Sequence, residues 1–304
     1  MKILSILPAL VLTVLPAQAA FVTLSSPDGL WSWSPDEFGA YGEGTGGSFA
    51  QRNFGSGLTG YSWQAATLVT DGINRQWLSG AASAGSAGYT GAPLGAGNLI
   101  SDTSTSSTRT SVYTAGTLST LRVTLTQSAT NAGLSQQYVF NNTGGAALNF
   151  SVISFHDTDL DANTFLNDLI TSRPGYLQVS EGGRNIYFSS AGVGSLGFLA
   201  AHVPGSGVTG GANVLAENNN GIPFANLNQF RDVTNGVIGA DFDANADGVT
   251  DTPTDVGYLL QYNLSIPAGA SSTVTFLTSA VPVPEPGPAI FLGLTGLLAF
   301  RRRR

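Results

Sequence analysis

The sequence predicts an all-β fold, an antiparallel β-sandwich with long loops rich in Gly, Ser and Thr. Composition is the first reason: only 10% of the 304 residues are charged and 39 are glycine, whereas globular proteins average about 25% charged residues and about 7% glycine. Such a composition is poor in strong helix formers. The second reason is that short runs alternate apolar and polar residues and are separated by glycine-rich turns. The 42% share of hydrophobic residues is sufficient for a core.

The expected strands are read from this alternation. Residues 121–126 alternate apolar and polar side chains, and residues 258–266 place their Tyr, Leu and Ile side chains on one face. A turn at 267–270 and a return strand at 273–278 then complete a predicted hairpin. Further strands are predicted at residues 61–70, 110–113, 136–141, 148–155, 176–179, 186–189 and 195–202.

The remaining segments are assigned to loops, turns and two short helices. Helix is predicted at residues 163–170 and 223–230 only. Residues 80–107 and 203–220 have low complexity and are expected to form long surface loops or edge excursions of a sheet. The run 192–197 matches a glycine-rich dinucleotide fingerprint, but such matches arise easily in a chain with 39 glycines, so a turn is expected there.

The N-terminus has the pattern of a secretory signal peptide. Lys2 precedes a mostly apolar run at residues 3–15, and Ala17-Gln18-Ala19 is the small-x-small pattern that signal peptidase reads. The run is shorter than the ~20 residues that a membrane-spanning helix needs. We therefore expect residues 1–19 to direct export by the Sec machinery, with cleavage near Ala19.

The C-terminus carries three features in order. Val283-Pro284-Glu285-Pro286 leads into the uncharged stretch 287–300, and Arg301 to Arg304 close the sequence. This arrangement resembles the PEP-CTERM sorting signal, so residues 281–304 are interpreted as a sorting segment. The resemblance implies a Gram-negative bacterium that makes exopolysaccharide, transient insertion of the apolar helix into the inner membrane, and processing by an exosortase. It also implies a final place at the cell surface, in the outer membrane or outside the cell. An ordinary tail anchor, with its arginines kept cytoplasmic, is the alternative.

Residues 20–280 form the predicted β-sandwich body, in which no domain boundary is evident. Between the two terminal segments lie seven basic residues, all arginine, and eighteen acidic ones, a formal charge of −11. A body of this charge repels DNA, RNA and anionic lipid. The chain has no cysteine, which excludes disulfides, thiol catalysis and cysteine metal sites.

An acidic stretch near residue 250 has the spacing of a calcium loop. Oxygen-bearing side chains stand at positions 1, 3, 5 and 9, and Gly248 stands at position 6, where such loops turn sharply. The loop resembles those of dockerin and thrombospondin type 3 repeats, although Thr254 replaces the acidic residue at position 12. We therefore predict Ca²⁺ as a structural ion, with a solvated acidic loop as the alternative. The predicted ligands are Asp243, Asn245, Asp247 and Asp251.

A second acidic stretch contains Asp157, Asp159 and Asp161 beside His156. It lacks the glycine of a calcium loop, and its simplest interpretation is a turn that caps a following helix. The carboxylates could also serve as the acid and base pair of a glycoside hydrolase, and Asp157 could orient His156 as a general base. His202 ends an apolar strand and is interpreted as a structural residue.

The four tryptophans all lie in the first third of the chain. If exposed they could stack on sugar rings, and if buried they belong to the core, which is the favoured interpretation. They are Trp31, Trp33, Trp63 and Trp77.

Three functional hypotheses follow. The favoured one is a non-enzymatic exported surface or matrix protein that associates with exopolysaccharide or binds carbohydrate, with structural calcium. The second is a secreted polysaccharide hydrolase that uses the carboxylates of residues 157–161. The third is a purely structural surface module without a ligand.

Overall fold

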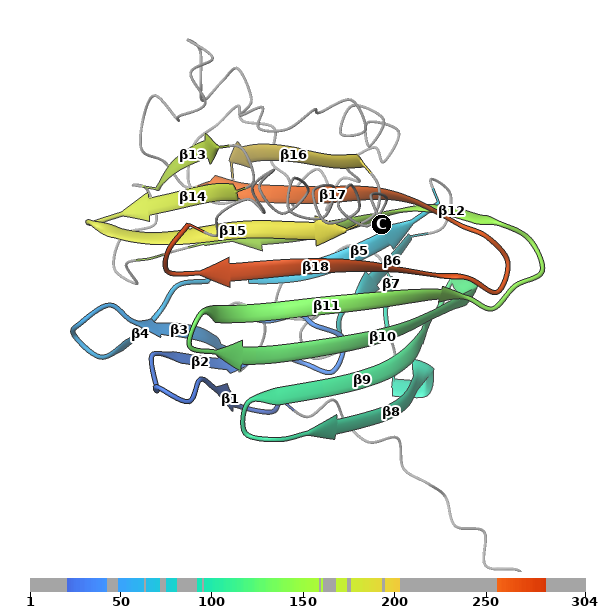
Figure 1. The fold of residues 1–304 in the computed structure, drawn as a ribbon, viewed down its shortest axis with the longest axis horizontal. Coiled ribbons are helices and arrows are strands. Elements are labelled where there is room, and N and C mark those ends of the chain that lie inside the picture. Colours follow the sequence, from blue (N-terminus) through green and yellow to red (C-terminus); the bar gives the residue numbers. More distant parts are fainter. Residues whose placement is uncertain are drawn as a thin grey trace, which may run out of the picture.

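The computed structural model describes residues 21–42, 49–62, 64–71, 75–80, 92–94, 96–158, 160, 168–173, 176–192, 195–202 and 256–282. Their strands form three sheets, of eight, six and four strands (Figure 1). All strand pairs are antiparallel except β6 with β7. Within this part of the chain the one helical segment is the 3-10 turn Ala96–Asn98. The predicted all-β fold is therefore confirmed.

The eight-stranded sheet is the largest layer and is built from successive hairpins. Its central strands alternate buried and exposed residues, as β9 and β10 show most clearly. At the turn between β10 and β11, Gly133 has φ 144°, and a Cβ there would lie 2.0 Å from the carbonyl oxygen of Thr278, so only glycine fits. In spatial order the strands are β13 (Leu169–Arg173), β14 (Tyr176–Glu181), β15 (Arg184–Gly192), β18 (Ser271–Ser279), β11 (Gly133–Asn142), β10 (Leu118–Thr130), β9 (Thr108–Ala115) and β8 (Leu99–Ser104).

The six-stranded sheet packs against this layer. Its strand β12 pairs with β17 on one side and β5 on the other, and residues 151–156 of β12 are buried on both faces. In spatial order the strands are β16 (Ser195–His202), β17 (Val256–Ile266), β12 (Leu148–Asp157), β5 (Gln64–Thr70), β6 (Arg75–Leu78) and β7 (Ala92–Pro93).

The core lies between the two large sheets. Phe140 of β11 meets Phe150 of β12 edge-on, with ring centroids 5.4 Å apart. Tyr262 of β17 and Phe276 of β18 make a second aromatic contact across the layers, at 6.2 Å. The Tyr138 hydroxyl on β11 is hydrogen-bonded to Thr67 on β5 at 3.0 Å. These contacts define a β-sandwich.

The small four-stranded sheet lies beside the sandwich (Figure 1) and consists of β1 (Leu24–Ser25), β2 (Trp31–Ser34), β3 (Phe49–Asn53) and β4 (Leu58–Gly60). The segment 35–40, which follows β2, runs over the buried face of the eight-stranded sheet. Two glutamine side chains of that sheet hold it: Gln127 donates to the carbonyl of Asp36 at 2.8 Å, and Gln136 donates to that of Gly39 at 2.7 Å.

The strand predictions that fall on described residues are confirmed, with shifted ends. One helix prediction is wrong in part: residues 169–170, the end of the expected helix 163–170, belong to strand β13. Ile170 is β-branched, pairs with Val179 of β14 and is buried, so sheet burial decides the conformation. The expected edge excursion within residues 80–107 is strand β8, which lies at the edge of its sheet.

Other expectations fall partly or wholly outside the described residues. These are the termini 1–20 and 283–304, the remainder 163–167 of the first helix, the helix 223–230 and the loop 203–220. The run 192–197 enters strand β16 at Ser195, whereas a dinucleotide site needs a helix there. In the described part of the chain no helix is long and apolar enough to cross a membrane.

Candidate functional site

The predicted calcium ligands Asp243, Asn245, Asp247 and Asp251 lie outside the described residues, as do Asp159 and Asp161. Asp157 is the last residue of β12, and its backbone pairs with Gln64 and Gly257. Among the described residues no group of three or more His, Asp or Glu side chains could hold a metal ion. The calcium site and the paired carboxylates therefore remain predictions.

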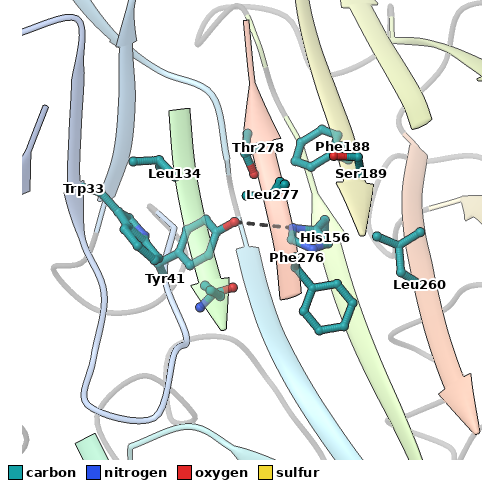
Figure 2. Close-up of a pocket in the computed structure, with 11 residues that line it drawn as sticks. Trp33, Tyr41, Leu134, His156, Phe188, Ser189, Leu260, Phe276, Leu277 and Thr278 are labelled. Atoms are coloured by element: carbon teal, nitrogen blue, oxygen red, sulfur yellow. Dashed lines mark hydrogen bonds between the residues drawn. The ribbon is translucent and has the colours of Figure 1, made fainter. Parts of the chain in front are cut away.

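His156 lies inside the sandwich, on the face of β12 toward the eight-stranded sheet (Figure 2). Its Nε2 atom is 2.9 Å from the Ser154 hydroxyl, and its Nδ1 atom is 3.4 Å from the Tyr41 hydroxyl. The imidazole also packs against Phe188, with ring centroids 5.2 Å apart. Burial lowers the pKa of His156 to about 3, because charging an enclosed imidazole costs its hydration.

The cavity beside His156 is small. Figure 2 shows its walls, which include Trp33, Tyr41 and Phe276. The space that the centre of a water molecule can reach is about 10 Å³, which is room for about one water. Sites for sugars and other small ligands measure about 300–1,000 Å³. The imidazole of His156 is 3% exposed and lies beside a cavity of this size, so a sugar could reach it only after a large rearrangement.

The tryptophans that the structure describes belong to the core, as predicted. Trp31, Trp33 and Trp77 are each at most 2% exposed, and Trp63 lies outside the described residues. Trp33 packs edge-on against Tyr41 at 5.2 Å, and Trp31 packs edge-on against Tyr61 at 5.9 Å. None of these three indole rings is open to stack on a sugar.

A buried charge cluster holds segment 35–40 in place. Arg109 of β9 donates through Nε and Nη2 to both oxygens of Asp102, at 3.0 and 2.7 Å, and through Nη1 to the carbonyl of Pro35 at 2.9 Å. Glu37 lies 3.5 Å from the same guanidinium. Burial and the neighbouring Asp36 nevertheless raise the pKa of Glu37 to about 7. The cluster has a structural role, because Arg109 and Glu37 are at most 2% exposed.

Asp36 orders the same segment from within. Its Oδ1 atom accepts hydrogen bonds from the amides of Phe38 at 2.9 Å and Ala40 at 2.8 Å, and its Oδ2 atom accepts one from Gly80 at 2.6 Å. A carboxylate that accepts hydrogen bonds from several backbone amides fixes the conformation of a loop, as a capping side chain does at the start of a helix.

At the surface, the guanidinium groups of two arginines both lie near one aromatic ring. The Cζ atom of Arg52 on β3 lies 5.1 Å from the ring centroid of Phe54, and that of Arg184 on β15 lies 5.3 Å from the same centroid. All three side chains are half-buried. Sequence reasoning missed this group, which we call the arginine–phenylalanine cluster. The scarcity of arginine marks each one as unusual, but nothing in the sequence places residue 52 beside residue 184.

Comparison with known proteins gives only distant similarity. No protein-family model and no curated protein matches the chain. Among solved structures, a bacterial glucoamylase in complex with acarbose has a TM-score of 0.43 and 9% identity over 86% of this chain, which spans only 34% of the glucoamylase. A galactose mutarotase-like protein of Lactobacillus casei has a TM-score of 0.39 and 10% identity, over 86% of this chain and 99% of that one. A putative aldose 1-epimerase of Escherichia coli has a TM-score of 0.35 and 8% identity over the same shares.

Proposed function

We propose that this chain is an exported, non-enzymatic protein of the cell surface or extracellular matrix that associates with polysaccharide. The observation that carries the proposal is the pairing of a signal-peptide pattern at residues 1–19 with the motif 283–286, the apolar stretch 287–300 and four terminal arginines. A chain with both ends of this kind is exported and then held briefly at the inner membrane, because arginine is costly to move through the bilayer.

The described body supports a binding role rather than catalysis. The sandwich encloses His156 and the three described tryptophans, and the cavity beside His156 has room for about one water molecule. A polysaccharide would therefore meet the outside of the sandwich. In this proposal Ca²⁺, bound by Asp243, Asn245, Asp247 and Asp251, stabilises the acidic loop, and an exosortase removes the tail near residues 284–286.

The sorting part is tested by mass spectrometry of the surface-exposed protein in its host. The expected result is a chain that starts near residue 20 and lacks the apolar stretch 287–300, which is short for a permanent span. Deleting Arg301–Arg304 is expected to missort the protein. Recovery of intact peptides through Arg304 from the surface fraction would instead identify a plain tail anchor.

The binding part is tested by a glycan-binding and hydrolysis screen of the purified chain with and without calcium. Binding without turnover is expected. Turnover that is abolished by Asp157→Asn or Asp161→Asn would establish the hydrolase hypothesis instead. Binding to no glycan at all would favour a purely structural module.

A further inference from the structure

The outer face of the eight-stranded sheet carries rows of hydroxyl and amide side chains. Cross-strand partners point to the same face of a sheet, so the register places outward side chains in rows that cross the strands. One row consists of Leu277 of β18, Ser135 of β11, Ser128 of β10 and Thr108 of β9. In the next row, Thr126 of β10 lies between Thr110 and Gln137. The four strands lie side by side in Figure 1, and neighbouring strands in a sheet are about 4.8 Å apart.

Charge is nearly absent from this face. Among the residues of the face whose side chains the structure describes, Arg122 of β10 is the only charged one. Arg109 of β9, by contrast, lies on the inner face and is buried. The residues between the two terminal segments carry a formal charge of −11, so the body as a whole repels a polyanion. A ligand that suits this face is therefore uncharged.

The polar groups of the two rows are available to a ligand. Ser128, Ser135 and Thr126 are half-buried, and Gln137 is exposed. Within the part of the chain that the structure describes, none of these four side chains makes a hydrogen bond to another residue. A bound sugar hydroxyl would replace water as their partner, and each such exchange contributes little by itself. A row of them can contribute more, because one extended ligand meets several groups at once.

A pair of tyrosines lies beside these rows. Tyr187 of β15 pairs with Ser279 of β18, which is two residues from Leu277 and shares its face. Tyr176 of β14 packs edge-on against Tyr187, with ring centroids 5.6 Å apart. Both rings are half-buried, so part of each meets solvent. An aromatic ring in such a position can stack on the apolar face of a sugar.

A fixed amide group stands next to the tyrosines. The cross-strand partner of Tyr187 is Gln178 of β14. The Gln178 amide donates to the side-chain oxygens of Ser180 and Asn185, each at 2.8 Å, and the Ser180 hydroxyl donates to the same Asn185 oxygen at 2.7 Å. These hydrogen bonds hold the polar groups in place before a ligand arrives, which lowers the entropy lost on binding. Aromatic rings with a few well-placed polar groups are the usual composition of a small-molecule site.

We propose that the outer face of the eight-stranded sheet binds a neutral, β-linked glucan. One sugar ring stacks on Tyr176 and Tyr187, and the following sugars extend over the row that contains Ser135 and Ser128. A β-linked glucan is an extended ribbon with apolar faces and hydroxyl groups along its edges, so it matches an aromatic pair that continues into a row of hydroxyls. An α-linked glucan coils and does not follow such a row. The inference rests on the proposed association with polysaccharide and names the class of polymer.

The test uses the full chain, purified in detergent, in calorimetric titrations with barley β-glucan, dextran and polygalacturonate. The β-glucan is expected to bind, and the other two polymers at least about tenfold more weakly. Tyr176→Ala and Tyr187→Ala are each expected to weaken β-glucan binding at least about tenfold, whereas Tyr187→Phe retains the ring and stays within about twofold of the wild type. Ser128→Val removes one hydroxyl of the row and is expected to weaken binding about threefold. Leu58→Ala is the control, because Leu58 is an exposed apolar residue on β4 of the small sheet.

Circular dichroism and thermal melting establish that each variant is folded, and Ser128→Val decides the matter if the tyrosine variants unfold. Equal binding of β-glucan by wild type, Tyr187→Ala and Ser128→Val would overturn this site and leave polysaccharide association intact, as would binding of dextran or polygalacturonate alone. A loss in Leu58→Ala as large as in Tyr187→Ala would also overturn the site. Binding to none of the three polymers would overturn the site and count against the proposed function as well. Sedimentation that shows a dimer dissociated by Tyr187→Ala, without glucan binding, would assign the face to contact between two copies and overturn the proposal.

Discussion

Replacing His156 by glutamine is expected to remove most of the acid sensitivity that one buried imidazole gives to the folded state. The ring is 3% exposed and lies against Phe188 and the hydroxyls of Ser154 and Tyr41. Glutamine retains hydrogen-bonding groups at this position and does not titrate. The substitution His156→Gln therefore removes the titrating group and keeps hydrogen-bonding groups at this position, so the pH dependence of stability reports mainly on protonation of the imidazole.

The magnitude follows from the two pKa values of the imidazole. The pKa of His156 is about 3 in the folded protein and about 6.5 in the unfolded chain. Between these values the unfolded chain binds a proton that the folded protein does not, so stability falls as pH falls. From pH 7.5 to pH 5 this single group lowers the free energy of unfolding by about 2 kcal/mol, and the loss continues until pH approaches 3.

Urea denaturation at pH 7.5 and pH 5 measures the effect. The wild type is expected to lose about 2 kcal/mol more than His156→Gln over this interval. All other titrating groups, Glu37 included, are common to both proteins and cancel in the difference. NMR titration of the imidazole supplies a second measurement, with no protonation of His156 expected above pH 4 in the folded protein. Equal pH dependence of the two proteins, or a midpoint near 6.5, would refute the reasoning.

Three further changes have expected outcomes. The pKa of Glu37 is raised to about 7 in the folded protein, so the ionisation of Glu37 lowers the stability of the folded state as pH rises. Relative to the wild type, Glu37→Gln is expected to have a free energy of unfolding that is about 2.5 kcal/mol higher at pH 8 than at pH 5, measured by urea denaturation. Gly39→Ala is expected to lower the free energy of unfolding by about 3 kcal/mol, because φ at residue 39 is +102° and the new Cβ would lie 2.5 Å from a tyrosine hydroxyl. Gly29→Ala is the control: φ there is +69° and the new Cβ would have no atom within 4 Å, so the expected loss is about 1 kcal/mol. If residues 241–255 bind calcium, millimolar Ca²⁺ raises Tm and Asp247→Asn abolishes the rise; melting that is insensitive to calcium and to chelator would contradict the site.

The fold class was predictable because the β-sandwich is encoded locally. On β10 the apolar residues Leu121, Val123 and Leu125 alternate with polar ones, and these three apolar residues are fully buried in the core. The same signal places β11, β12 and β17. The burial of the described tryptophans was predictable as well, since large aromatic side chains contribute most to a core.

The arrangement of the polar groups was not predictable, because long-range contacts decide it. Asp102 and Arg109 are only seven residues apart, but Arg109 is buried, and it also donates to the carbonyl of Pro35 in the segment after β2, which is 74 residues away in the sequence. Likewise Ile170 joins a sheet because β14 presents Val179 to it, although its local sequence permits a helix. The arginine–phenylalanine cluster depends on a contact between residues 54 and 184, for which a single sequence carries no signal.

The buried charge cluster and the arginine–phenylalanine cluster are connected through the small sheet. Arg52 lies on β3, which pairs with β2, and the segment that leaves β2 is fixed to the eight-stranded sheet by Arg109 and Gln127. Arg184 belongs to the eight-stranded sheet itself. The separation of the two guanidinium groups therefore depends on how firmly segment 35–40 is attached. If Arg109 or Gln127 is lost, the small sheet is expected to shift before the sandwich unfolds, because the hairpins of the large sheet keep their own pairings.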